Sequence, residues 1–370
     1  MAYLKIDDGG EETALADEFI FNNYDQLEKS GLFKRISNLD DEVKLYKKIV
    51  QESIDIINCD SVESLARMVS QILMDKFIPS FIGFVSQEDL DSNTVSTIFY
   101  KNLKPADAII EVKSIARYND IFKITQTAMT FEAFKYIAKD PALINPFIPV
   151  SPKIIVPMMG QNELYGMIIL GDKVVSGEYN GNDITFINTI ISYTSIALQN
   201  IIHYKRAIMD LKTRMYNYSY FVKRLFEEIS RIKRYKNCCT VALIDIDNFR
   251  DVNNKYGHKA GDKVIRSVAS IIKACLRESD IAARYGGEEF GVLLVQTRIP
   301  EAVLVMDRIR KNIEKEQFVY EDYIMSITIS LGLTFIHQDA DSLYIDEILK
   351  KADNALYKSK IEGRNRITIF

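Results

Sequence analysis

The run TVALIDI at residues 240–246 constrains the fold more than any other stretch, because it is apolar or β-branched until it ends in carboxylates. Such a run predicts a strand that is buried on both faces of a sheet. Alternation along the strand puts Asp245 and Asp247 on one face at its end. Hard divalent cations bind a few anionic oxygens together with waters and phosphates, so one or two Mg²⁺ ions would fit there. The alternative is a pair of solvated turn residues.

A second motif, RYGGEEF at residues 284–290, lies between two further apolar runs. Gly286 and Gly287 predict the turn of a hairpin. Glycines also let a phosphate approach backbone amides, while Glu288 and Glu289 can hold a metal ion. The alternative is an ordinary hairpin with two glutamates on its rim, but the two motifs reinforce each other.

Composition predicts an ordinary folded protein with two cores. The chain has 370 residues, more than most single cores organise. Its formal charge of -4 comes from interspersed charges, which argues against nucleic acid as a partner. The stretch 184–202 is too polar for a membrane span, and the acidic N-terminus lacks the pattern of a secretory signal. We therefore expect a cytoplasmic protein with no membrane partner.

Residues 41–183 are expected to form a sheet flanked by helices. Helical spacing of apolar residues runs from 41 to 74, and strands are predicted at 81–85 and 94–100. A hairpin is predicted from 153–159 and 164–170, while 101–150 read as irregular. The order of elements, with Val156-Pro157 followed by Gly166 and an apolar run, resembles the GAF family of small-ligand sensor domains. Residues 1–40 are expected to be a helix or arm, and an unspecialised α+β domain remains the alternative.

Residues 184–216 are predicted to form a helical linker whose apolar positions step in heptads. This pattern indicates a coiled-coil seam in a homodimer, although Thr194 and Ala197 weaken it and can instead pack inward. The seam consists of Ile187, Ile190, Thr194, Ala197, Ile201, Tyr204, Ile208, Leu211 and Met215.

Residues 217–370 resemble the GGDEF family of diguanylate cyclases, whose signature has the form GGEEF here. IDIDNFRDVNNKYGHKAGD at 244–262 is similar to the family's first strand and guanine-binding helix. TISLG at 328–332 and ADNALYKSKIEGRN at 352–365 are similar to its later motifs. The resemblance implies a two-domain α+β protein whose C-terminal domain has a palm-like, mostly antiparallel sheet. It also implies the condensation of two GTP into cyclic di-GMP.

By this resemblance, the metal ions, Mg²⁺ or Mn²⁺, are held by Asp245, the Ile246 carbonyl, Glu288 and Glu289. Asp245, Glu288 and Glu289 are the expected catalytic residues, with Glu289 nearest the reacting hydroxyl. The expected substrate-binding residues are Asn248, Phe249, Arg250, Asn253, Asp262, Lys360 and Arg364. Asn253 and Asp262 are expected to read guanine, and Lys360 and Arg364 to contact phosphate. The alternatives are helix-end charges for the last two, and for Asp262 an N-cap of a helix at 263–276.

Arg277 and Asp280 form an RxxD motif ahead of the hairpin, at the position where family members bind cyclic di-GMP as an inhibitor. Arg308 is expected to add a contact, and an exposed helix end is the alternative. The segment DLKTRMYNYS at 210–219 departs from the family's DxLTGLxNRR pattern, which leaves the route of signals into the domain open. A homodimer controlled by an unknown small-molecule ligand of the GAF-like domain is expected. The rival function is a catalytically silent receptor for GTP or cyclic di-GMP.

Overall fold

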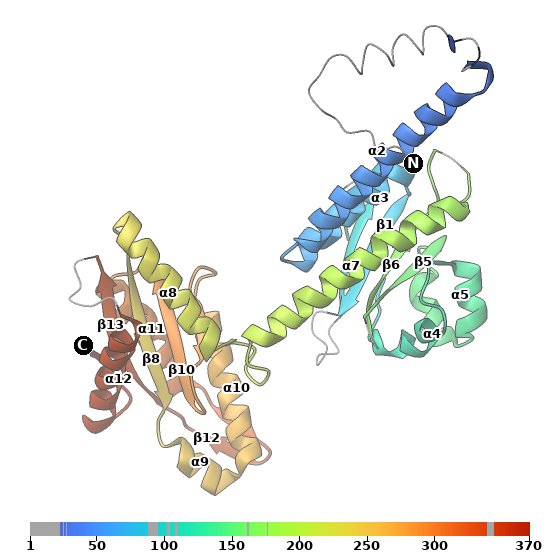
Figure 1. Ribbon diagram of the computed structural model, residues 1–370. Helices are drawn as coiled ribbons and strands as arrows, with labels where there is room; N and C mark the ends of the chain where they lie inside the picture. Colours follow the sequence, from blue (N-terminus) through green and yellow to red (C-terminus); the bar gives the residue numbers. More distant parts are fainter. Residues whose placement is uncertain are drawn as a thin grey trace, which may run out of the picture. The chain divides into compact units, whose positions relative to one another are not determined.

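The structure is a computed structural model that describes residues 23–24, 26, 28–87, 95–101, 104–107, 110–160, 163–175, 177–338 and 344–370. These residues form two compact units, one ending at Ile202 and the other beginning at His203. Each unit is built on its own six-stranded sheet (Figure 1). Within the described ranges, no helix is long and apolar enough to cross a membrane.

The N-terminal unit contains an antiparallel sheet with the strand order β3-β2-β1-β6-β5-β4. The predicted strands at 81–85 and 94–100 are confirmed as β1 and β2, and the predicted hairpin is β5 paired with β6. The strands are β1 (Phe81–Gln87), β2 (Val95–Lys101), β3 (Lys104–Ala106), β4 (Met129–Thr130), β5 (Ile154–Met159) and β6 (Leu164–Leu170).

Helices cover both faces of this sheet, which is why its central strands are continuous apolar runs. The side chains of Ile82 and Phe84 pack with α3, α7 and the end of α2. Those of Val85 and Ile169 pack on the opposite face, with α4 and α5. The helices are α2 (Leu32–Ile57), α3 (Val62–Phe77), α4 (Asn119–Ile124), α5 (Phe131–Ala138), α6 (Pro141–Ile144) and α7 (Gly181–Ile208).

The segment 101–150 is not the irregular connection that the sequence predicted. It contains α4, α5 and α6, and its aromatic side chains Phe122, Phe134 and Phe147 are fully buried. These helices are only one or two turns long, too short for a period of 3.6 residues to show in the sequence.

Helix α2 crosses the predicted boundary between an arm ending at residue 40 and a domain beginning at 41. The end of the helix or arm expected over residues 1–40 is therefore the first part of the same helix. Residues 1–22 lie outside the described ranges.

The predicted seam on the linker helix is wrong for its first five positions. Its five positions from Ile187 to Ile201 are at most 5% exposed, because they pack against the sheet of their own unit. Inward packing, the alternative for Thr194 and Ala197, therefore holds for all five. The helix also ends at Ile208, and Met215 beyond it is buried in the C-terminal core.

The C-terminal unit has the strand order β14-β13-β8-β10-β9-β7, with β8 in the interior as predicted. Strand β8 pairs antiparallel with both β10 and β13, while the β13–β14 and β7–β9 pairs at the two sides are parallel. The strands of the unit are β7 (Tyr216–Asn217), β8 (Cys238–Ile246), β9 (Ile281–Arg284), β10 (Glu289–Val295), β11 (Phe318–Tyr320), β12 (Tyr323–Met325), β13 (Ile329–His337) and β14 (Ile367–Ile369).

Five helices cover the two faces of this sheet. Helices α9, α10 and α11 pack on one face with Ile244 and Val292, and α8 and α12 on the other with Leu243 and Leu293. The helix α12 approaches β13 so closely that a Cβ at Gly332 would overlap the α12 backbone. The helices are α8 (Tyr218–Tyr235), α9 (Phe249–Tyr256), α10 (His258–Ala274), α11 (Ile299–Lys315) and α12 (Ile345–Ile361).

Candidate active site at the end of the central strand

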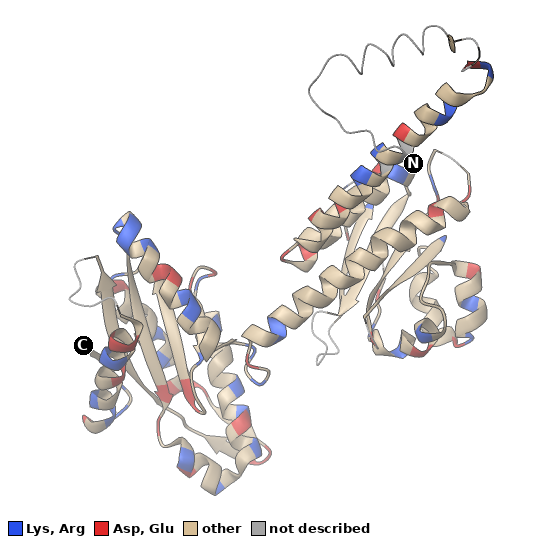
Figure 2. Ribbon diagram, viewed as in Figure 1, with Lys and Arg blue, Asp and Glu red and all other residues tan. Residues whose placement is uncertain are grey.

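The carboxylates of Asp245 and Glu289 meet where the central strand ends. The two residues are directly paired across β8 and β10, so their side chains leave the same face of the sheet. Figure 2 shows acidic segments gathered at this end of β8 and β10. The geometry fulfils the expectation that the strand end and the Gly-Gly hairpin form one cluster.

Burial and neighbouring negative charges raise the pKa of both carboxylates. Desolvation raises the pKa of Asp245, and Lys360 opposes the effect through an ion pair of 2.8 Å between its Nζ and Asp245 Oδ2. Desolvation also raises the pKa of Glu289, and the neighbouring charges of Asp245, Asp353 and Glu288 add to the shift. A raised pKa is a common property of groups that exchange protons or bind cations.

The oxygen donors present fit a hard divalent cation. Asp245, Glu288, Glu289 and the Ile246 carbonyl offer the anionic and neutral oxygens that such ions prefer. The ammonium group of Lys360 supplies positive charge at Asp245. Among the described residues, no three or more His, Cys, Asp or Glu side chains form a group that could hold a metal ion, so the fit is one of chemical type.

The carboxylate of Asp247 is engaged in hydrogen bonds within the protein, which the alternation argument did not foresee. Asp247 is 6% exposed, and its carboxylate accepts hydrogen bonds from Thr328 Oγ1, Ser330 Oγ and the Asn365 backbone amide. A buried carboxylate satisfied in this way fixes structure. Asp247 ties the end of β8 to β13 and to the turn after α12.

Arg284 holds the Gly-Gly turn in place. Its guanidinium donates to the carbonyls of Gly286 and Gly287 and pairs with Asp210 at 3.1 Å. Burial raises the pKa of Asp210, but hydrogen bonds from Thr213 and the charge of Arg284 outweigh it and leave that pKa low. No role was predicted for the contact between Arg284 and Asp210, because 74 residues separate the two in the chain.

The predicted guanine-reading residues lie close to each other at the packed start of α10. Asn253 is on α9, and a Cβ at Gly261 would overlap its Oδ1, so the glycine makes room for the amide. Asp262 follows Gly261 inside α10, which begins at His258, so the alternative N-cap role is wrong. The carboxylate of Asp262 accepts a hydrogen bond from Lys212 at 2.5 Å.

The remaining expected substrate residues divide into exposed and buried side chains. Asn248 and Arg250 are exposed at the start of α9, whereas the side chain of Phe249 is buried in the core. Arg364 is exposed and lies past the end of α12 with a φ of 61°. Its positive charge lowers the pKa of Asp245, so Lys360 and Arg364 both act on the same carboxylate.

Arg277, Asp280 and Arg308 line one small cavity of about 170 Å³. Asp280 Oδ2 accepts from the Arg277 backbone amide, and Oδ1 accepts from that of Val295. Arg308 donates to the Cys275 carbonyl at 2.6 Å. The three residues expected to bind product are therefore neighbours at one site.

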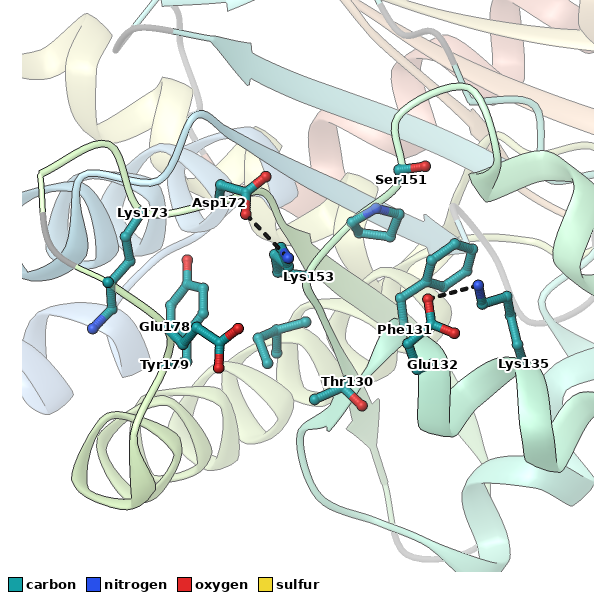
Figure 3. A pocket seen from close by; sticks show the side chains of 13 residues that line it. Thr130, Phe131, Glu132, Lys135, Ser151, Lys153, Asp172, Lys173, Glu178 and Tyr179 are labelled. Carbon is teal, nitrogen blue, oxygen red and sulfur yellow. Dashed lines mark ion pairs between the residues drawn. The ribbon is translucent and has the colours of Figure 1, made fainter.

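The N-terminal unit has a larger cavity of about 470 Å³ (Figure 3). Its lining includes Lys153 paired with Asp172 and Lys135 paired with Glu132. Lys173 also lines it, and its Nζ pairs with Asp183. Each of these three lysines is therefore paired with a carboxylate.

Comparison with known families identifies the C-terminal unit. Residues 207–366 match the family model described as the GGDEF domain of diguanylate cyclases. The C-terminal unit therefore contains a GGDEF domain.

The curated relatives are similar to only part of this chain. Diguanylate cyclase A of Treponema denticola is 36% identical over 235 residues, which are 62% of this chain and 63% of that protein. The probable diguanylate cyclase DgcT of Escherichia coli is 38% identical over 162 residues, 43% of this chain and 35% of that protein. The chain thus spans less than two thirds of the length of either relative.

Among solved structures, the coiled coil and GGDEF domain of DgcB from Caulobacter crescentus, in complex with cyclic di-GMP, is similar at 25% identity. The match has a TM-score of 0.48 and covers 52% of this chain and 100% of that chain.

Proposed function

We propose that the chain is a diguanylate cyclase that condenses two GTP into cyclic di-GMP and two diphosphates. The observation that carries the proposal is the cross-strand pair of Asp245 and Glu289 beside the Gly-Gly turn of a GGDEF domain. In each of two steps, the 3'-hydroxyl of one GTP attacks the α-phosphorus of the other, and the bond to diphosphate breaks.

The residues of this site have the roles that such a transfer needs. Glu289, with its raised pKa, lies nearest the reacting hydroxyl and accepts its proton. Asp245, Glu288, Glu289 and the Ile246 carbonyl would hold a divalent cation, Mg²⁺ or Mn²⁺, which would neutralise charge at the phosphates. Lys360 and Arg364 add positive charge on the same side.

Selectivity for guanine is assigned to Asn253 and Asp262. A carboxylate accepts from the N1-H and the 2-amino group of guanine, and adenine offers no such pair of donors. With ATP bound, the Asp262 carboxylate would lack these two hydrogen-bond donors, so ATP is expected to be a poor substrate. Gly261→Ala should weaken GTP binding by displacing the Asn253 amide, and unchanged GTP affinity in that variant would contradict the assignment.

We also propose that the activity is regulated by its product. The cavity lined by Arg277, Asp280 and Arg308 binds cyclic di-GMP and limits synthesis, because Arg side chains stack on guanine and hydrogen bond to it. Arg277→Ala should then let product accumulate further before the rate falls. An unchanged inhibition curve would exclude this site.

The N-terminal unit is proposed to be a GAF-like sensor. The antiparallel sheet with helices on both faces supports the proposal, and the cavity of Figure 3 is the place where a small ligand would bind. Because each GGDEF domain holds one GTP and the product needs two, we also propose a homodimer.

The test is incubation of the purified chain with GTP and Mg²⁺, with products identified by mass spectrometry. Cyclic di-GMP should form from the native chain, and Glu289→Gln should lower its rate at least about 100-fold. Ser37→Glu, an exposed change in the other unit, is the matched control and should not alter the rate. Binding of GTP or cyclic di-GMP without any product would favour the receptor function instead.

A further inference from the structure

Helix α2 carries a stripe of large apolar side chains that its own unit does not cover. They are between 40% and 63% exposed, and they are Leu32, Ile36, Leu39, Val43, Tyr46, Val50, Ile54 and Ile57. Ser53 and Ile56 are the buried side chains among those described on this helix. Figure 1 shows that the first half of α2 runs beyond the strands of its sheet. An apolar surface of this kind marks an interaction site.

The spacing of the stripe indicates a second helix as its occupant. From Leu32 to Val50 the steps alternate strictly between four and three residues, the 3.5-residue period of a left-handed coiled coil. One seam position is β-branched throughout, and the other is Leu in its first two heptads. These positions are Ile36, Val43 and Val50 for the first, and Leu32, Leu39 and Tyr46 for the second. This combination favours two parallel strands.

The flanking charges agree with a parallel pair in register. Arg35 directly precedes the seam residue Ile36, and Asp40 directly follows Leu39. In a parallel two-stranded coil these two flanking positions come together across the interface, so Arg35 of one helix would meet Asp40 of the other. Closer to the domain, Ile49 and Ile54 occupy the same two positions and widen the apolar contact.

We propose that α2 is a dimerisation helix and that its occupant is α2 of a second copy of this chain, parallel and in register. Among the described residues, no buried core residue comes from the first part of the helix, and isolated helices of about 12–15 residues are marginal in water. A partner helix supplies the missing packing. The stretch 1–22 of the same chain is a poorer occupant, because its apolar residues do not recur with a 3.5-residue period.

The dimer does not depend on the proposed activity, and only its effect on the reaction rate rests on that activity. If each GGDEF domain binds one GTP, pairing two chains through α2 raises the local concentration of the second domain. The inference therefore names a surface for the homodimer in place of the seam predicted on α7.

The test is sedimentation velocity of the full chain without nucleotide, over a range of concentrations. The native chain should be a dimer, and Leu39→Glu with Val43→Glu should raise the dissociation constant at least about 100-fold, because the seam would bury charges. Ser37→Glu with Asn38→Glu is the matched control, since these neighbouring exposed residues lie off the stripe and change the charge equally. The control should remain a dimer.

Cysteine cross-linking tests the orientation separately. Ile36→Cys and Val50→Cys should each form a disulfide between identical residues of two copies, whereas Ser37→Cys should not exceed the background of the native thiols. An antiparallel pair would leave Ile36→Cys and Val50→Cys uncrosslinked and would overturn the parallel arrangement. A monomeric native chain, or a dimer unaffected by the paired Glu substitutions, would overturn the proposal as a whole.

Loss of catalysis and loss of pairing are distinguishable. Glu289→Gln should remain a dimer while it loses synthesis, because Glu289 is not part of α2. If the native chain makes no cyclic di-GMP but pairs through α2, the proposed function is wrong and the proposed dimerisation through α2 is still supported.

Discussion

Helices α2 and α7 carry similar apolar repeats but use them differently. They are 26 and 28 residues long, and both show steps of three and four residues. On α7, the stripe from Ile187 to Ile201 is at most 5% exposed, whereas the stripe on α2 is at least 40% exposed. A heptad repeat therefore predicts that a helix has a seam, but it does not say whether a sheet or a second chain covers it.

The two helices differ in the width of their apolar face. On α7 the seam residues have buried neighbours, as in the pairs Ile190-Ile191 and Ala197-Leu198. A face this wide is typical of a helix that packs on its own domain. On the first half of α2, polar residues such as Ser37 and Lys44 lie beside a narrow stripe, which is typical of a coiled coil.

The largest expected difference in stability is between variants that place a charge in the apolar stripe of α7 and in that of α2. Ile190→Glu on α7 buries a carboxylate at a position that is fully buried, and it should destabilise the N-terminal unit by more than about 4 kcal/mol. Val43→Glu on α2 should leave the unit folded. Thermal unfolding followed by circular dichroism measures the stability of both variants. Equal losses of stability in the two variants would contradict the difference between the stripes.

A smaller effect is expected at the start of α7. Desolvation alone raises the pKa of Asp183, but hydrogen bonds from Lys173 and the Asn180 backbone outweigh it and lower that pKa. A lowered pKa means that ionised Asp183 stabilises the fold above the ordinary pKa of the group and that this contribution is lost as the pH falls through the lowered value. Asp183→Asn should therefore cost about 1 kcal/mol at neutral pH and nothing in strong acid.

Denaturant titrations of Asp183→Asn and the native chain at several pH values test this sign. A difference that grows as the pH falls would contradict it. Asp172→Asn is a suitable control, because its ion pair with Lys153 is more exposed and should contribute little.

The smallest effect is expected on the outer face of α7. Ile196 is 47% exposed there, so Ile196→Glu should change stability by no more than about 0.5 kcal/mol. If α2 alone pairs the chains, this variant should also keep the native dissociation constant in sedimentation. A monomeric Ile196→Glu variant would show that α7 shares the interface.

The strand, hairpin and helix patterns of the GGDEF unit were predictable because its motifs are local. The buried run of β8 and the Gly-Gly turn specify where Asp245 and Glu289 lie along the chain, and pairing of adjacent strands brings them together. Alternation along the strand alone did not separate Asp245 from Asp247, since Asp247 is bound by Thr328, Ser330 and Asn365, which are more than 80 residues away.

Other contacts were missed for the same reason. Lys212 reaches Asp262, and Asp210 reaches Arg284, across 50 and 74 residues. Both contacts come from the segment that departs from the family pattern, so the segment is attached to the site despite its unusual sequence. In the N-terminal unit the patterns predicted the central strands but not the short helices between 101 and 150.

The most direct test of the central claim is the rate of cyclic di-GMP formation per chain, measured with GTP and Mg²⁺ over a range of protein concentrations. The native chain should make cyclic di-GMP, and the variant with Leu39→Glu and Val43→Glu should need far higher concentrations to reach the same rate per chain. Absence of cyclic di-GMP at every concentration, with GTP recovered intact, would contradict the assignment of synthesis to the site at Asp245 and Glu289.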